Sequence, residues 1–363
     1  MAISETVSNV LVYITLVSFL GVGLYGGYRQ ARTKVDFLAA LRTQSAIPLA
    51  ANFFTTSIGS SILFAYPELA TIAGLLGLFM YAFTSTIPLL VFAWLGPIIR
   101  RKCPEGFTLT QFILVRFHRI NQIYVSLMSM AFMFCYMVAE LSSIALVLYY
   151  LAGLDKLAPI IVIAVVTTLY TAYGGFRASL FTDTVQGWII LILMVIATIA
   201  VAVNVKIDKH AIDDSGLLKS TSLGWQLLYI LAVAITFANF FHQGFWQRAF
   251  SSKNDRELYK ATVFASVMLF PTLFLIGVTG LLAVWAGLCC DENNVGAFAF
   301  FSLLAKLPDW VVGFVIILSV ALACSAYDTL QSAMVSTMSN DLFQNKLSLT
   351  IIRIIVFVIN VPA

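Results

Sequence analysis

Long apolar runs separated by short polar stretches recur along the whole chain. Many of them approach or exceed the roughly 20 residues that a helix needs to cross a bilayer, and none alternates as barrel strands do. We therefore predict an all-α polytopic membrane protein embedded in a lipid bilayer. The predicted spans cover residues 6–28, 46–73, 76–99, 120–152, 157–175, 179–204, 223–246, 259–288, 310–340 and 347–363.

The distribution of charge agrees with this class and orients the chain. Of 363 residues, 61% are hydrophobic and 10% are charged, whereas a soluble domain carries about 25% charged residues. Lysines and arginines gather in alternate loops, beginning with Arg29, Arg32 and Lys34 after the first apolar run. Because positive loops stay in the cytoplasm, we predict an N-terminus outside the cell and expect the plasma membrane. The net charge of +4 reflects this orientation and indicates no nucleic-acid partner.

The sequence lacks motifs for ATP use, metal binding and catalysis. It contains no phosphate-binding loop and no zinc-ligand spacing, and His118, His210 and His242 form no metal-binding or catalytic pattern. We therefore expect no enzymatic activity, no cofactor and no metal beyond a transported cation. Any uphill movement of a solute would have to draw on an ion gradient.

A first polar cluster interrupts the second predicted span. Most residues from Asn52 to Ser61 carry a hydroxyl or an amide or are glycine, and Tyr66-Pro67-Glu68 follows them. One interpretation is a face of small residues that packs against a neighbouring helix. We favour an unwound stretch whose free carbonyls hold a cation, because so dense a cluster exceeds what packing requires.

A second cluster, at residues 239–248, lies at the end of the seventh span. An interfacial belt of aromatic and polar anchors would explain Trp246 and Arg248, but it explains the deeper His242 and Gln243 poorly. Transporters built from two repeats often interrupt one helix of each repeat near the middle of the membrane. The two clusters therefore predict a pair of broken helices.

Two carboxylic acids lie more than ten residues from either end of a predicted span. Asp328 stands more than ten residues from either end of the ninth span, so it must be protonated, paired or facing a polar cavity. Glu140 lies within the fourth span. It either pairs with a polar neighbour for structural reasons or contacts an ion or a solute.

Residues 174–186 carry a glycine pair, an arginine, an aspartate and a glutamine as G-G-x-x-A-x-x-x-T-D-x-x-Q. This pattern resembles the signature of the sodium:solute symporter family. Further matches are Pro67 after the first cluster, Gln247-Arg248 in the second, and Ser325-x-x-Asp328. The resemblance implies a leucine-transporter-type core of two inverted five-helix repeats, preceded by one extra helix.

On that resemblance, residues 6–28 form the extra helix, 46–205 the first repeat and 223–363 four helices of the second repeat. The chain ends at Ala363, inside the tenth predicted span. We therefore expect the fold to be truncated before its last core helix.

The resemblance also implies a site for the coupling cation. Carbonyls of Thr55 and Ile58 and, on the ninth span, the carbonyl of Leu322 and the hydroxyl of Ser325 would bind the ion. The next position is Ala326, where members commonly carry a second hydroxyl. Both Na⁺ and H⁺ therefore remain open, with Asp328 nearby as the proton carrier. Asp183 matches the signature aspartate, which the family links to ion coupling or to the inner ion exit.

For the solute, the runs Ser-Ser-Ile-Leu-Phe-Ala-Tyr-Pro-Glu and Gly-Pro-Ile-Ile-Arg-Arg-Lys-Cys-Pro-Glu-Gly-Phe resemble a fungal branch of urea and polyamine permeases. Ile235 and Ala238 occupy positions where sugar symporters need an amide and a tyrosine, which disfavours sugars. The residues predicted to line the solute site are Ser57, Ser60, Ser61, Glu140, His242 and Gln243.

We therefore predict cation-coupled symport of a small polar solute by alternating access, with urea favoured and a polyamine as the other candidate. Two alternatives stay open: a receptor-like or regulatory protein with the same fold that does not transport, and a passive solute channel.

Overall fold

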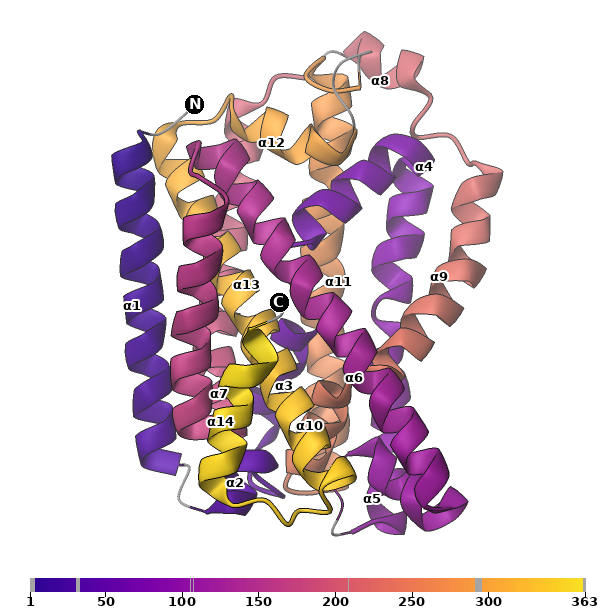
Figure 1. Cartoon of the computed structure of the whole chain (residues 1–363). Coiled ribbons are helices and arrows are strands. Elements are labelled where there is room, and N and C mark those ends of the chain that lie inside the picture. Colours follow the sequence, from indigo (N-terminus) through magenta and orange to yellow (C-terminus); the bar gives the residue numbers. More distant parts are fainter. Residues whose placement is uncertain are drawn as a thin grey trace.

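The computed structural model describes residues 4–30, 33–104, 106, 108–207, 209–290 and 296–361. Nearly all of them are helical, and the long helices run beside one another between two ends that carry the short connecting segments (Figure 1). In the first half of the chain the helices are α1 (Glu5–Gln30), α2 (Lys34–Leu38), α3 (Ala46–Thr56), α4 (Ile62–Thr84), α5 (Ile87–Lys102), α6 (Leu109–Ala152) and α7 (Leu157–Asn204). In the second half they are α8 (Lys209–Ser215), α9 (Ser222–Phe241), α10 (Gln243–Ser251), α11 (Asp255–Trp285), α12 (Ala299–Leu304), α13 (Asp309–Thr337) and α14 (Leu349–Asn360).

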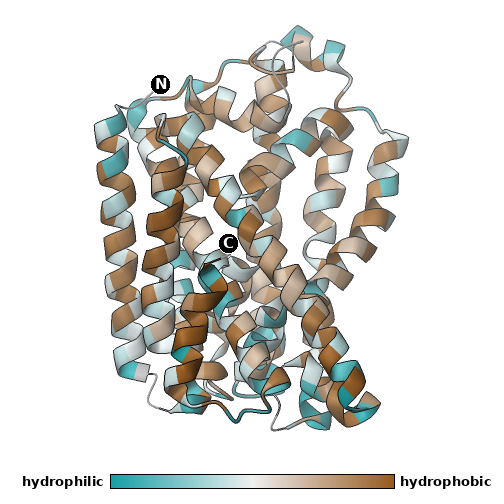
Figure 2. Cartoon of the chain, in the orientation of Figure 1, coloured by the Kyte–Doolittle hydropathy of each residue, from teal (hydrophilic) through white to brown (hydrophobic). Residues whose placement is uncertain are grey.

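Seven helical segments in the described part of the chain are long and apolar enough to cross a membrane. In Figure 2 hydrophobic residues run along the lengths of the helices, and hydrophilic residues occur at the two ends and at some positions in the interior. The ten predicted spans exceed these seven segments because two pairs of spans are joined, within residues 62–102 and within α7, and because α14 is a shorter helix. The prediction of a polytopic helical membrane protein is confirmed.

Single glycines mark two points at which a long helix bends sharply. Gly74 in α4 and Gly175 in α7 have φ of 67° and 58°, a backbone conformation that favours glycine. A Cβ on Gly175 would collide with the carbonyl oxygen of Phe37. Tyr170 and Phe181, which flank Gly175, both pack against the same end of α1, so α7 turns back on itself. These bends lie at the predicted boundaries between spans.

Both predicted helix breaks are present. α3 ends at Thr56 and α4 begins at Ile62, while α9 and α10 are separated at His242. The His242 imidazole caps α10, since its Nδ1 accepts a 3.2 Å hydrogen bond from the Gly244 N–H. Each break therefore joins two helical halves through a short polar segment.

One half of each broken helix, α3 in the first and α10 in the second, is held to the other by backbone pairing. Residues 42–45, which we call the strap, precede α3 and pair with residues 250–253 after α10. The Thr43 N–H donates to the Ser251 carbonyl at 2.8 Å, and the Lys253 N–H donates to the Gln44 carbonyl at 2.9 Å. The start of α3 is thereby fixed to the end of α10.

The centre of the molecule contains many polar side chains. In α13, 83% of the most apolar stretch is buried, and all nine residues of α10 are buried. Helix α13 packs mainly against α7 and α6, and α10 packs against α13 and α3. The candidate site is built where these helices meet.

Candidate functional site

Glu140, a residue of α6, binds the segment that forms the first helix break. Its side chain is fully buried and its carboxylate accepts hydrogen bonds from the Ser60 N–H at 2.7 Å, the Ser60 hydroxyl at 2.9 Å and the Ser61 hydroxyl at 2.7 Å. A Cβ on Gly59 would collide with the same carboxylate. The Ser60 N–H thus binds Glu140 where a continuous helix would bind it to the carbonyl of Thr56. Residues 57–61 leave the helical path at the point where they surround this acid.

A cavity of about 480 Å³ lies beside this break, between α4, α5, α6, α9 and α10. The rings of Tyr66 and Tyr81 stack in its wall with centroids 4.1 Å apart, and Tyr136 meets the His242 ring edge to face at 6.0 Å. No carboxylate belongs to its described lining, but Glu140 lies directly behind Ser61. The cavity therefore combines aromatic walls with polar groups, and its Ser61 corner adjoins a buried carboxylate.

The structure divides the predicted solute residues into two groups. Ser57, Ser61 and His242 line the cavity, whereas Ser60, Glu140 and Gln243 do not. Gln243 is engaged with α6: its carbonyl oxygen accepts from the Leu109 N–H at 3.2 Å, and its amide donates to the Ser129 hydroxyl at 3.1 Å.

The sequence analysis missed Tyr81 and Tyr136 as lining residues. A tyrosine inside an apolar run resembles the aromatic belt of a membrane interface. The pairing of two such residues with a neighbouring break could not be read from one sequence.

The predicted cation ligands at the first break differ in availability. In a continuous α-helix the Ile62 N–H would donate to the Ile58 carbonyl. Here it donates to the Gly59 carbonyl at 3.3 Å instead. The Thr55 carbonyl accepts from the Ile58 N–H at 3.2 Å, and the Thr55 hydroxyl donates to the Asn52 carbonyl at 3.1 Å. The Ile58 carbonyl is therefore the freer of the two predicted oxygens.

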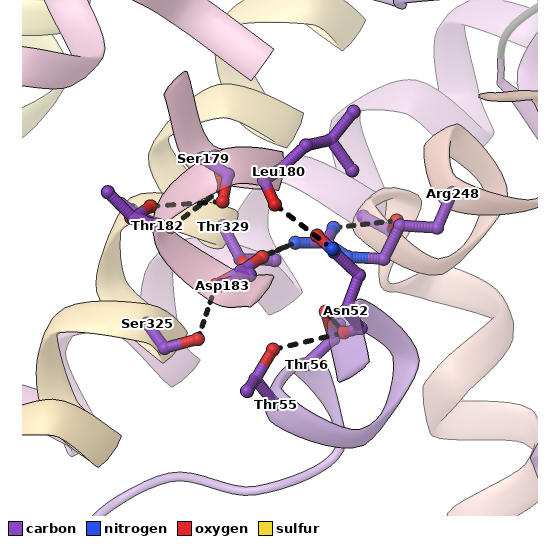
Figure 3. Close-up of polar contacts among 12 residues, drawn as sticks. Asn52, Thr55, Thr56, Ser179, Leu180, Thr182, Asp183, Arg248, Ser325 and Thr329 are labelled. Atoms are coloured by element: carbon purple, nitrogen blue, oxygen red, sulfur yellow. Dashed lines mark hydrogen bonds and ion pairs between the residues drawn. The ribbon is translucent and has the colours of Figure 1, made fainter. Parts of the chain in front are cut away.

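Asp183 joins three helices at the centre of the molecule (Figure 3). Its fully buried carboxylate forms an ion pair with Arg248 of α10 and accepts a 2.5 Å hydrogen bond from Ser325 of α13. The Arg248 guanidinium also donates to the Thr329 hydroxyl at 2.7 Å. Additional hydrogen bonds of this kind offset part of the cost of burying an ion pair, although the Arg248 Nε has no hydrogen-bond partner among the described residues. The signature aspartate thereby holds α7, α10 and α13 in register, next to the predicted cation ligand Ser325.

Asp328 faces α7 through a set of hydroxyl groups. It accepts hydrogen bonds from Tyr170 at 2.6 Å, Ser179 at 2.8 Å and Thr182 at 3.0 Å. Thr182 adjoins Asp183, so the two acids share one interface between α7 and α13. Within the described residues Arg248 pairs with Asp183, and no basic side chain pairs with Asp328.

The structure therefore brings Asp183, Ser325 and Asp328 together at the α7–α13 interface. Leu322 is buried one turn before Ser325 on α13. Thr55 and Ile58 lie at the end of α3 and in the break that follows it, and α3 packs against both α7 and α13. Among the residues with defined positions, no group of three or more metal-ligating side chains occurs.

Comparison with protein families and known proteins gives a consistent result. The model of the sodium:solute symporter family matches residues 37–351. The spermidine transporter DUR31 of Candida albicans is 44% identical over 362 residues, which are 99% of this chain and 69% of that protein. Sodium/glucose cotransporter 1 of Oryctolagus cuniculus is 30% identical over 197 residues, 53% of this chain and 29% of its own length.

Solved structures with the same fold include a Na⁺-coupled sialic acid symporter, with a TM-score of 0.83 at 17% identity over 98% of this chain and 80% of that one. The structure of MhsT in complex with L-phenylalanine has a TM-score of 0.67 at 15% identity, over 89% of this chain and 79% of that one. At these identities the likeness concerns the fold, and the predicted leucine-transporter-type architecture is confirmed. These relatives are transporters, which also confirms the expectation that the chain is not an enzyme.

Proposed function

Because the chain belongs to the sodium:solute symporter family, we propose that it carries a polyamine such as spermidine in symport with a cation. Membership of the family supports cation-coupled symport in general. The polyamine is supported by the 44% identity to a fungal spermidine transporter over almost the whole chain. Urea, which the sequence analysis favoured, is not supported by any named relative reported above and becomes the second candidate.

The observation that carries the proposal is the aromatic cavity with a buried carboxylate behind it. A polyamine alternates methylene segments with ammonium groups. The faces of Tyr66, Tyr81 and Tyr136 suit both parts, since aromatic rings pack against methylenes and attract cations. Glu140 would supply the opposite charge through the Ser61 corner of the cavity.

We assign the predicted solute residues accordingly. Ser57, Ser61 and His242 contact the solute, because they line the cavity. Ser60 and Gln243 are positioning residues: Ser60 binds Glu140, and Gln243 ties α10 to α6. Glu140 has both an electrostatic and a positioning role.

For the coupling ion we favour Na⁺ held by the carbonyls of Thr55, Ile58 and Leu322 and the hydroxyl of Ser325. Ser325 donates its proton to Asp183, which leaves the oxygen lone pairs of Ser325 for an ion. Hard cations such as Na⁺ prefer several oxygen ligands, so the missing hydroxyl at Ala326 keeps H⁺ as the alternative. Asp328, with three hydroxyl partners and no basic partner among the described residues, would then carry the proton.

We further propose that the protein resides in the plasma membrane with its N-terminus outside. The end of the molecule near the strap carries Arg42, Arg100, Arg101 and Lys253, in agreement with a cytoplasmic position. A cysteine introduced near Ser4 should react with a membrane-impermeant thiol reagent only from outside, and one introduced near Lys253 only from inside. This result would support the orientation.

Uptake into proteoliposomes tests the function. The chain is reconstituted, and radiolabelled spermidine or urea is supplied under an inward Na⁺ gradient or an inward proton gradient, each imposed alone. We expect spermidine to accumulate above its outside concentration under the Na⁺ gradient. Spermidine accumulation under the proton gradient alone would identify H⁺ as the coupling ion, with Asp328 as its carrier. Accumulation of urea alone would reject the polyamine.

The same assay separates the remaining alternatives. Equilibration of the solute without accumulation, equal under both gradients, would identify a passive channel. Saturable spermidine binding without uptake would identify the receptor-like alternative.

A further inference from the structure

A second polar cavity, distinct from the solute cavity, lies where α5 ends and α11 begins. It has a volume of about 410 Å³ and is lined by Arg42, Arg100, Arg101, Pro104, Lys253, Asn254 and Asp255. Four of these described lining residues are basic and one is acidic. The transport cycle proposed above uses none of them.

Arg100 is the buried member of this cavity. Only 6% of the residue is exposed, and its Nη2 donates a 2.7 Å hydrogen bond to the Ser252 carbonyl. Among the described residues its Nη1 is buried without a hydrogen-bond acceptor, and the carboxylate oxygen with which it forms an ion pair, on Asp255, is 3.7 Å away. Because a buried cationic donor without an acceptor is costly, an anionic or polar oxygen placed in the cavity would be stabilised by this nitrogen.

The other basic groups surround Arg100 on exposed positions. Arg42 belongs to the strap and has a positive φ of 53°, and its Nη2 lies 3.5 Å from the Pro104 carbonyl. Arg101 approaches Asp255 only to 3.9 Å. These distances exceed those of strong charge-assisted hydrogen bonds, about 2.7–2.9 Å. The Arg101 Nε also donates to the Pro97 carbonyl at 3.2 Å, so each guanidinium keeps other N–H donors for a ligand.

The N-terminus of α11 adds to the positive potential. Asn254 caps this 31-residue helix and accepts from the Glu257 N–H at 2.9 Å. A helix N-terminus carries a partial positive charge that favours anions. The helix end and the unpartnered Arg100 nitrogen therefore point to the same class of ligand.

We propose that this cavity binds a phosphate monoester or inorganic phosphate. Arginine forks match phosphate oxygens in geometry and charge, and basic cavities beside the cytoplasmic ends of membrane helices suit phosphorylated lipid head groups. The bound phosphate bridges Arg42 of the strap, Lys253 after α10 and Arg100 of α5. It therefore stabilises the pairing that fixes the start of α3 to the end of α10.

The test measures binding without requiring transport, so it stands apart from the proposed function. The purified chain is heated in detergent with dioctanoyl phosphatidylinositol 4-phosphate, dioctanoyl phosphatidylserine or inorganic phosphate at equal ionic strength. The variant Arg42→Gln/Lys253→Gln removes two exposed charges from the cavity. The matched control Arg116→Gln/Lys346→Gln removes two exposed charges outside its lining.

We expect the phosphoinositide to raise the unfolding temperature of the parent chain and the control by about 5 °C and to leave the cavity variant almost unchanged. The same shift with inorganic phosphate would support the site with a soluble ligand as its source. No shift with either phosphate compound would overturn the proposal. So would an equal shift with phosphatidylserine, or equal shifts in the cavity variant and the parent chain.

Discussion

The phenol of Tyr170 donates a 2.6 Å hydrogen bond to the carboxylate of Asp328, across the interface between α7 and α13. Two more hydroxyls of α7, from Ser179 and Thr182, reach the same carboxylate. Hydroxyl groups can either donate or accept, so this set can accompany Asp328 through a change of its charge. Asp328 can therefore keep hydrogen bonds to these hydroxyls in either protonation state.

If Asp328 carries charge during transport, Asp328→Asn will reduce gradient-driven accumulation of spermidine by at least tenfold, an effect of about 1.4 kcal/mol or more. Tyr170→Phe keeps the carboxylate and removes one hydrogen bond, so it should cost much less. Both are measured as accumulation ratios in proteoliposomes at equal protein density. Unchanged accumulation by Asp328→Asn would exclude the coupling role.

The Asp183–Arg248 pair is expected to show strong coupling in stability. Either Asp183→Asn or Arg248→Gln alone leaves a buried charge without its partner, which costs about 3–5 kcal/mol. The double variant removes both charges and should lose less than the sum of the two single variants. Thermal unfolding of the four proteins in detergent measures this. Additive losses would show that the pair contributes no mutual stabilisation.

Glu140→Gln tests the electrostatic part of solute recognition. A glutamine can still bind Ser60 and Ser61, so the break should persist while the negative charge is lost. We expect the KM for spermidine to rise by about tenfold, which corresponds to about 1.4 kcal/mol. Glu68→Gln, which changes an acid of α4 outside the cavity lining, is the matched control. Equal KM values for both variants would show that the charge of Glu140 does not contribute to solute recognition.

Gly175→Ala should destabilise the protein by about 1–3 kcal/mol or more, because alanine disfavours the left-handed backbone and its Cβ meets the Phe37 carbonyl. Gly21→Ala is the control: nothing lies within 4 Å of its Cβ position in α1, and alanine favours a helix by about 0.5–1 kcal/mol. Denaturation midpoints should therefore move in opposite directions. A shift in the same direction would contradict the assignment of the bend.

A pH dependence is expected from Asp36 in α2. Burial raises the pKa of this carboxyl, but hydrogen bonds from Thr33 and the Arg177 guanidinium, 2.8 Å away, outweigh burial and hold the pKa below its ordinary value. A depressed pKa contributes stability above the unfolded value of about 3.9, and this stability is lost as the pH falls towards the folded pKa. Asp36→Asn should therefore lower the unfolding temperature at neutral pH and flatten its fall below about pH 4. An unchanged acid slope would contradict this.

Much of the fold could be predicted because hydropathy locates where the chain leaves the membrane. The predicted boundaries near residues 74–75 and 175–179 coincide with the bends at Gly74 and Gly175. The fourth span was predicted to start at residue 120, whereas α6 begins at Leu109. The additional segment is too polar to appear as part of an apolar run, and it bends away at His118, where φ is 69°.

The candidate site was only partly predictable. Asp183, Asp328 and Glu140 attract notice because charges are costly in an apolar run. Their partners are set by packing between helices: Arg248 lies 65 residues from Asp183, and Tyr170 lies 158 residues from Asp328. No periodicity in one sequence encodes such distances. Placing the two acids at one interface therefore required the structure.

The bend at Gly175 also determines where the chain will accept foreign sequence. This turn has no loop of its own and is buried against the segment that follows α1. A protease site or epitope tag inserted there would have to separate α7 from that segment, even though hydropathy marks the position as a connection between spans. Helix α8 has no buried residue, so a label for mapping topology would disturb less packing there than at Gly175.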